Sequence, residues 1–183
     1  MTFLPSLRKG ASLLDLFKAF PQTSEPLIHF HEVLLRGPSP FTEGERELIA
    51  AYVSGLNHCR YCHGVHVATA ELLGAPKSAI LKALDDIESS SVDEKMKPVL
   101  RYARKLTHQP DSLTQADADA IFAVGWSDEA LYYTVAVTAL FNLMNRLVEG
   151  MGIELDPSYV KLASERLAKN GYLPLIELMK PKY

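Results

Sequence analysis

Helix-capping residues recur along the chain, and most precede a run of apolar residues spaced three or four apart. Alternation of apolar and polar residues, which is typical of a half-buried strand, is nearly absent. The expected helices lie at about residues 13–17, 24–36, 42–53, 57–74, 79–84, 91–109, 114–124, 127–149 and 156–170. The sequence therefore predicts an all-α fold, with about seven to nine helices in a single domain over residues 1–183.

The expected caps assign a start to most of these helices. Thr42 and Ser91 each begin a sequence with the capping-box pattern, in which a glutamate follows three residues later. Ser24 and Asn57 are expected N-caps of the second and fourth helices, and Ser127 of the long apolar one. We expect the loops to lie immediately before these residues.

The charge pattern narrows the classes of partner. The chain has 19 basic and 22 acidic residues and a net charge of −3, and its lysines and arginines form no cluster. Binding to nucleic acid or to an anionic membrane surface is therefore disfavoured. The first ten residues lack the apolar core and cleavage site of a signal peptide, so we expect a cytoplasmic protein.

The most apolar stretch, residues 130–144, is interrupted by Thr134, Thr138 and Asn142. It falls short of the roughly 20 apolar residues that a membrane span needs. We expect a buried helix that also contributes to a subunit interface, and hence a homo-oligomer. Asn142, Asn145 and Arg146 in this helix would either reach the active site or pair at that interface.

Two cysteines, the only ones in the chain, stand at C-x-x-C spacing as Cys59 and Cys62, with His63 and His66 close by. Two such thiols can form a disulfide and be reduced again, and an imidazole can accept a thiol proton. At about 100° per residue, all four side chains share an arc of about 100° on a helix. If Asn57 caps this helix, its N-terminal dipole would lower the thiol pKa values, with His66 as the base.

Glu47 joins this group only if the chain reverses. In one continuous helix it would lie about 22 Å from Cys62 along the axis. A reversal at residues 55–57 would place Glu47 and His66 at the same height on antiparallel helices, where the carboxylate could orient the ring. The residues therefore predict a relay of Glu47, His66 and Cys62, with Cys59 placed to attack whatever forms on Cys62.

The pattern Glu47-x11-Cys59-x-x-Cys62-x-x-x-His66 resembles the alkylhydroperoxidase D-like proteins of the carboxymuconolactone decarboxylase superfamily. The flanking residues 46–50 and 56–62 are similar to its peroxidase-related branch, and the core motif region is 42–74. The resemblance implies an alkylhydroperoxidase D-like helical fold in which an antiparallel helix pair carries the cysteines. It also implies assembly as a dimer, trimer or hexamer.

The resemblance further implies an antioxidant peroxidase-type oxidoreductase that reduces organic hydroperoxides without a cofactor. Cys62 would become a sulfenic acid, and Cys59 would condense with it to a redox-active disulfide. Glu47 and His66 would relay protons, and an external dithiol or a protein reductant would restore the thiols. Well-studied members carry a histidine where this chain has Tyr61, so Tyr61 and His63 are candidate auxiliary residues.

Three alternatives stay open at this point. Cys59 and Cys62 with His66 or His63, or with both rings, could supply three or four ligands for zinc. No second cysteine pair is present, however, and we expect no metal. A carboxymuconolactone decarboxylase-like lyase is a second alternative, but such members generally lack the cysteine pair. The third is a non-enzymatic redox- or metal-responsive helical oligomer. His29 and His31 are expected to mark alternate faces of a surface or interfacial helix.

Overall fold

The computed structural model describes residues 2–180, and within them every regular element is helical. The first helices are α1 (Leu13–Ala19), α2 (Pro21–Arg36), α3 (Glu43–Leu56), α4 (Arg60–Leu72) and α5 (Lys77–Asp85). They are followed by α6 (Met96–His108), a 3₁₀ turn (Pro110–Ser112), α7 (Gln115–Ala123), α8 (Asp128–Gly150), α9 (Pro157–Asn170) and α10 (Pro174–Met179). The predicted all-α class is confirmed, and α10 is a helix that the sequence analysis did not expect.

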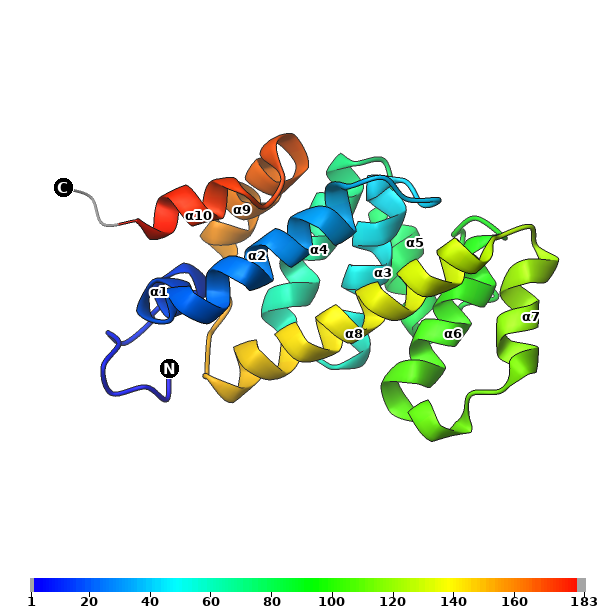
Figure 1. Ribbon diagram of the computed structural model, residues 1–183, viewed down its shortest axis with the longest axis horizontal. Helices are drawn as coiled ribbons and strands as arrows, with labels where there is room; N and C mark the ends of the chain where they lie inside the picture. The colour runs from blue at the N-terminus through cyan, green and yellow to red at the C-terminus, as the bar shows by residue number, and fades with distance from the viewer. Residues whose placement is uncertain (1, 181–183) are drawn as a thin grey trace.

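The antiparallel pair α3–α4 lies in the middle of the bundle, and the long α8 runs along it (Figure 1). Helices α1, α2, α9 and α10 gather at one end, whereas α6 and α7 lie at the other (Figure 1). Helix α3 contacts α4, α5, α6 and α8, so it has almost no free face. This central position fixes the two helices that carry the cysteine motif.

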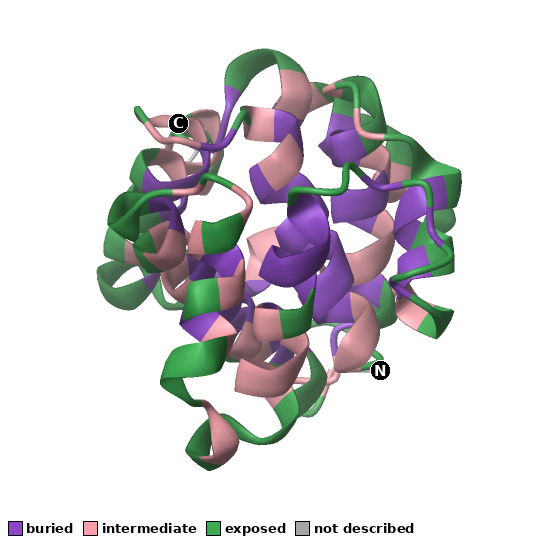
Figure 2. Cartoon of the chain, turned by 90° about the vertical axis from the view of Figure 1, so that its right-hand side faces the viewer, coloured by how far each residue is buried: buried purple, intermediate pink, exposed green. Residues whose placement is uncertain are grey.

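The middle of α3 is the most buried part of the chain. Every residue from 49 to 54 is fully buried, and most of them are apolar. Figure 2 shows the buried residues gathered in the centre of the bundle and the exposed residues on its outer turns. Burial of this apolar segment on several sides at once makes α3 a rigid support for its polar residues.

Two of the expected N-caps are present, and three are wrong. Thr42 forms a reciprocal capping box with Glu45, and the Ser127 hydroxyl accepts a hydrogen bond from the backbone N–H of Ala130. Helix α2 begins earlier than Ser24, because Pro21 already has the backbone angle of a first helical residue. Helix α6 begins later than Ser91, with Lys95 at the N-cap position. Asn57 is the third exception and belongs to the site.

Helix α8 is buried on one side only. Its inward residues include Val137, Phe141 and Met144, whereas Tyr132 and Leu143 are more than half exposed. The expectation of a buried helix therefore holds for one face, and the other face leaves apolar side chains at the surface. Within residues 2–180, no helix combines the length and apolar character needed to cross a membrane.

Candidate active site

The chain reverses between α3 and α4 through a three-residue connection. Asn57 ends α3, His58 adopts a positive φ of 56°, and Cys59 is the N-cap of α4. Asn57 does not cap α4, because its side-chain amide donates to Asn142 Oδ1 (3.1 Å) and Asn145 Oδ1 (2.8 Å) on α8. Both asparagines therefore turn inward and tie the reversal to α8.

The reversal brings Glu47 and His66 together, as its predicted geometry required. Glu47 Oε2 accepts a hydrogen bond from His66 Nδ1 at 2.6 Å. Both side chains are buried, and the carboxylate is completely so. Because Nδ1 carries the proton in this bond, the other ring nitrogen, Nε2, is left as the acceptor.

Two residues that the sequence analysis missed complete the surroundings of Glu47. Arg36 Nη2 donates to Glu47 Oε1 at 2.7 Å, and the Tyr172 hydroxyl donates to the same oxygen at 2.8 Å. Burial alone would raise the pKa of Glu47, but His66, Arg36 and Tyr172 together lower it to about 2. The carboxylate is therefore ionised at neutral pH, and it holds the His66 ring in one orientation.

The two cysteines are buried and not joined by a disulfide. Cys59 is completely enclosed, whereas Cys62 lines a cavity. A hydrogen bond with Cys59 and burial raise the pKa of the Cys62 thiol well above its ordinary value, and a hydrogen bond with Asn145 opposes them. The expected lowering of the Cys62 pKa by the helix N-terminus is thus wrong, since these two effects outweigh it.

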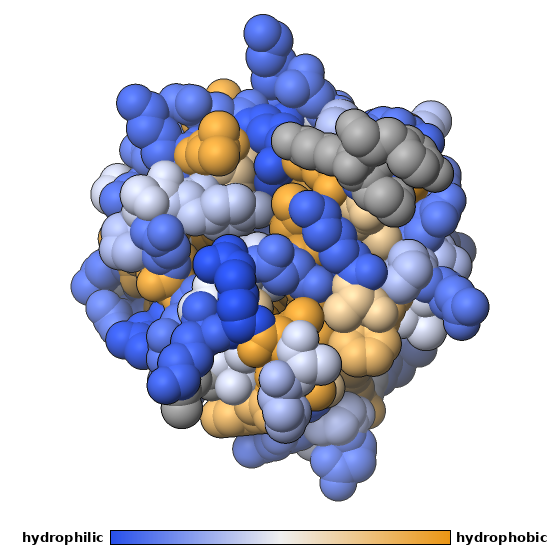
Figure 3. Space-filling view, turned by 90° about the vertical axis from the view of Figure 1, so that its left-hand side faces the viewer, coloured by the Kyte–Doolittle hydropathy of each residue, from blue (hydrophilic) through white to orange (hydrophobic). Residues whose placement is uncertain are grey.

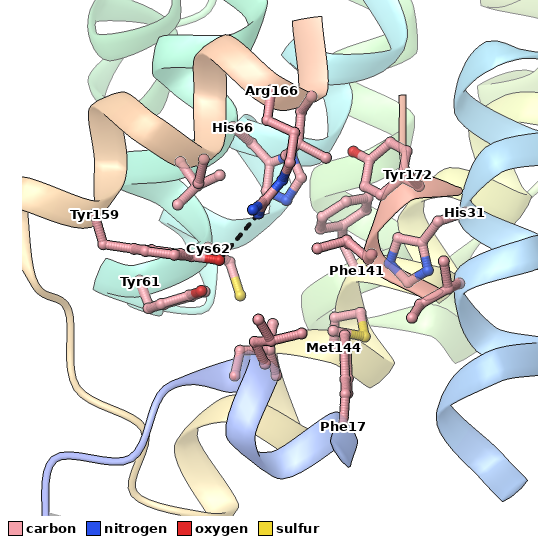
Figure 4. Close-up of a pocket in the computed structure, with 17 residues that line it drawn as sticks. Phe17, His31, Tyr61, Cys62, His66, Phe141, Met144, Tyr159, Arg166 and Tyr172 are labelled. Atoms are coloured by element: carbon pink, nitrogen blue, oxygen red, sulfur yellow. Dashed lines mark hydrogen bonds between the residues drawn. The ribbon is translucent and has the colours of Figure 1, made fainter. Parts of the chain in front are cut away.

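The cavity beside Cys62 has a volume of about 60 Å³ and lies between α1, α2, α4, α8, α9 and α10. Its walls are mainly apolar and include Phe17, Val65, Phe141 and Met144 (Figure 4). Figure 3 views the molecule from the α1 and α10 end and shows hydrophobic residues at the surface between hydrophilic ones. A small organic molecule in this cavity would be largely shielded from water.

His31 of α2 also lines the cavity, although we expected it at a surface or interface. Its Nδ1 donates to the backbone carbonyl of Leu27 at 2.7 Å, and its ring contacts those of Phe141 and Tyr172. Burial lowers the pKa of His31 to about 4, so the ring is neutral at neutral pH. The sequence signal for this position was its i+3 spacing from the buried Ile28 on an amphipathic helix.

The candidate auxiliary residues lie on different sides of α4. Tyr61 lines the cavity, and its ring stacks on that of Tyr159 with centroids 6.2 Å apart. His63 Nδ1 donates to the carbonyl of Ala51 at 2.9 Å, and His63 is not among the residues that line the cavity. Only Tyr61 is therefore placed to contact a molecule bound beside Cys62.

A metal site would need at least three suitable side chains in one place. Among residues 2–180, no group of three histidine, cysteine, aspartate or glutamate side chains could hold a metal ion. In the structure His66 Nδ1 is engaged by Glu47, and the two thiols contact each other.

Comparisons with known proteins agree with this fold. The model of the carboxymuconolactone decarboxylase family matches residues 21–105, whereas no curated protein matches the chain. An uncharacterised peroxidase-related protein from Silicibacter sp. TM1040 is 23% identical with a TM-score of 0.74, over 81% of this chain and 78% of that one. A peroxidase-related protein from Ralstonia eutropha JMP134, an alkylhydroperoxidase AhpD core, is 22% identical with the same TM-score and coverage.

The debrominase Bmp8, solved in complex with 2,3,4-tribromopyrrole, has the same fold with a different activity. It is 15% identical with a TM-score of 0.70, over 84% of this chain and 81% of that one. These likenesses concern the fold, and the family match covers α2, α3 and α4, which carry Glu47, Cys62 and His66, but not α1, α8, α9 or α10. Together they show an alkylhydroperoxidase D-like fold, and the family match over residues 21–105 supports the resemblance to the carboxymuconolactone decarboxylase superfamily.

Proposed function

We propose that this protein is a thiol-dependent peroxidase that reduces organic hydroperoxides through the Cys59–Cys62 pair. The observation that carries the proposal is the position of Cys62. Its thiol borders an apolar cavity one helical turn from His66, whose ring is held by the ionised Glu47, and Cys59 lies directly behind it. This arrangement combines a nucleophile, a base, an orienting group and a second thiol.

In the first step, His66 Nε2 accepts the proton of the Cys62 thiol. The thiolate sulfur attacks the terminal oxygen of the hydroperoxide, and the O–O bond breaks. The leaving alkoxide takes the proton back from His66 and departs as an alcohol, which leaves a sulfenic acid on Cys62. A base is needed here because the pKa of Cys62 is raised and its resting form is the thiol.

In the second step, Cys59 attacks the Cys62 sulfenic acid. A disulfide forms, the Cys59 proton and the hydroxyl group leave as water, and two electrons have passed from the thiols to the peroxide. An external dithiol or a protein reductant then reduces the Cys59–Cys62 disulfide by thiol–disulfide exchange, and its own two thiols are oxidised to a disulfide. The enclosed position of Cys59 suits this role, because it can react only with a group already present on Cys62.

The same reasoning suggests a cellular setting. A dithiol that must be reduced after each turnover suits the reducing cytoplasm. The exposed Tyr132 and Leu143 on α8 and Val33 on α2 support assembly as a homo-oligomer, because they leave apolar surface that a second copy could cover. The peroxidase-related neighbours support the reaction class at the level of the fold, whereas the debrominase shows that this fold carries other chemistry as well.

Substitution of each cysteine tests the proposal directly. Reduced protein is treated with one equivalent of tert-butyl hydroperoxide, a small organic hydroperoxide, and is weighed intact after trapping of thiols and sulfenic acid. We expect the wild type to lose two hydrogens through a Cys59–Cys62 disulfide. Cys59→Ser should accumulate trapped sulfenic acid, and Cys62→Ser should slow peroxide consumption by about three orders of magnitude or more.

Two results would contradict this proposal. Equal residual activity in Cys59→Ser and Cys62→Ser would remove the assigned roles of the two thiols. Thiols of the wild type that stay free for many minutes would leave the lyase and the non-enzymatic redox-responsive oligomer as the better candidates.

A further inference from the structure

Arg166 is a cation that lines the cavity, and no carboxylate among residues 2–180 pairs with it. It lies on α9 two turns after Tyr159, so both side chains project from the same face of the helix. Arg166 Nη2 donates to the Tyr159 hydroxyl at 3.1 Å, and the guanidinium carbon lies 6.0 Å from the centre of that ring. Its Nε is buried and has no hydrogen-bond partner, and within residues 2–180 it forms no ion pair.

The other polar groups of the cavity do not balance this charge. Burial raises the pKa values of Tyr61 and Tyr172 and lowers that of His31, so these groups are neutral at neutral pH. Cys62 is also a neutral thiol at rest, since its pKa is raised. The ionised Glu47 is held by Arg36 and His66 instead.

Arg166 is partly exposed, but its buried Nε lacks a hydrogen-bond partner, and an anion bound beside it would supply one. Figure 4 shows the Arg166 side chain extending into the space beside Cys62 and bonded to Tyr159. A carboxylate suits this position, because its two oxygens match the planar donors of a guanidinium. The small volume and the apolar walls require the rest of such a ligand to be compact and apolar.

We propose that the cavity binds a compact, apolar organic carboxylate through Arg166, and that the peroxide substrate is a hydroperoxide carrying such a carboxylate. The second part rests on the proposed peroxidase function, whereas the first part concerns binding alone. In this arrangement Arg166 and Tyr159 hold the acid group, and the hydroperoxide end lies against the Cys62 sulfur. Arg166 is then a specificity-determining residue that takes no part in proton transfer.

The binding part is tested with benzoate and its neutral isostere benzamide, both of which are inert toward the thiols. Calorimetric titration of the reduced protein should show benzoate binding at least about 10-fold more tightly, as expected for charge-assisted hydrogen bonds. Arg166→Gln should abolish this preference. Lys169→Gln is the matched control, because Lys169 is exposed on the same helix and the charge change is identical. It should keep the full preference.

Arg166→Lys provides a second variant in case Arg166→Gln folds poorly. It retains the cation but loses the planar pair of donors, so a reduced preference of a few-fold should remain. Equal binding of benzoate and benzamide to the wild type would overturn the inference without any variant. A preference that survives in Arg166→Gln would overturn it as well.

The substrate part is tested with the hydroperoxide of a short branched carboxylic acid and the corresponding primary amide. Wild-type Cys62 should be oxidised at least about 10-fold faster by the acid than by the amide, and in Arg166→Gln this ratio should fall below about 2-fold. If Arg166→Gln slows both substrates equally, Arg166 acts on Cys62 and the inference fails. Arg166-dependent benzoate binding without oxidation by either hydroperoxide would support the binding site and contradict the peroxidase.

Discussion

The two walls of the cavity are built in different ways. One wall, here called the motif wall, consists of Cys62 and His66 on α4 with Glu47 of α3 behind them. The other, here called the closing wall, consists of Tyr159 and Arg166 on α9, Tyr172 before α10, and the apolar residues of α1. The motif wall belongs to the buried centre of the bundle, whereas the closing wall is formed by helices gathered at one end (Figure 1).

On the proposed function, this difference would separate the residues that carry out the reaction from those that select the substrate. The groups assigned to proton transfer lie 19 residues apart on one helical hairpin, so their geometry depends on two adjacent helices. The groups that would recognise a substrate come from the C-terminal helices, and the Tyr172–Glu47 hydrogen bond joins positions 125 residues apart. Relatives with this fold can therefore keep the hairpin and change the closing wall, which is one way for a debrominase and peroxidase-related proteins to share it.

The largest expected effect on stability comes from removing the buried negative charge of the motif wall. Glu47→Gln removes the charge that balances the buried Arg36, and we expect the free energy of unfolding to fall by about 3–5 kcal/mol. Urea denaturation at pH 7 measures this loss. Glu43→Gln is the control, because Glu43 lies on the same helix, is half exposed and approaches Arg36 only at 3.6 Å. Its loss should stay below about 1 kcal/mol, and a similar loss in both variants would contradict the special position of Glu47.

A smaller effect is expected at His31, whose ring touches the closing wall at Tyr172. Folding lowers the pKa of His31 from 6.5 to about 4. Between these two pH values, His31 is therefore protonated in the unfolded chain and neutral in the folded protein. Stability from this source is complete above about pH 6.5 and is lost as the pH falls, by roughly 2 kcal/mol between pH 7 and pH 5. Denaturant titrations should show this loss in the wild type and not in His31→Phe. His29→Gln, at an exposed position of the same helix, should keep the wild-type profile.

The features that could be predicted from sequence are those that depend on neighbouring turns of one or two helices. The periodic apolar residues predict the all-α class, and the positions of Glu47 and His66 on either side of the reversal predict their contact. Asn57 shows the limit of such reasoning. Its local pattern predicts a cap for α4, but the side chain is taken up by two asparagines of α8.

The remaining features depend on contacts between distant segments, for which a single sequence carries no periodic signal. Arg36 and Tyr172 look like ordinary helix-end residues until the fold places both against the Glu47 carboxylate. The pKa of Cys62 illustrates a competition rather than a missing contact. Helix α4 begins two residues later than expected, with Cys59 at its N-cap, and burial and the neighbouring Cys59 determine the direction of the shift.

The smallest expected effect comes from removing the hydrogen bond between Tyr172 of the closing wall and Glu47 of the motif wall. Tyr172→Phe removes the hydroxyl that donates to Glu47 Oε1 but keeps the ring that lies against Arg36 and His31. We expect a loss of about 1–2 kcal/mol in the free energy of unfolding, since a charge-assisted hydrogen bond is lost while the packing remains.

The same substitution should also raise the pKa of Glu47, because the Tyr172 hydrogen bond helps to lower it. The acid loss of stability, which in the wild type runs from about pH 4.5 down to about 2, should therefore end at higher pH and be smaller in total. Tyr133→Phe is the matched control, since it removes a hydroxyl that donates to Pro38 outside the cavity and should leave the acid limb unchanged. If Tyr172→Phe costs as much as Glu47→Gln, the two walls form one cooperative unit. In that case the proton-relay hairpin could not be kept while the closing wall varies among relatives, and the division between chemistry and specificity would be wrong.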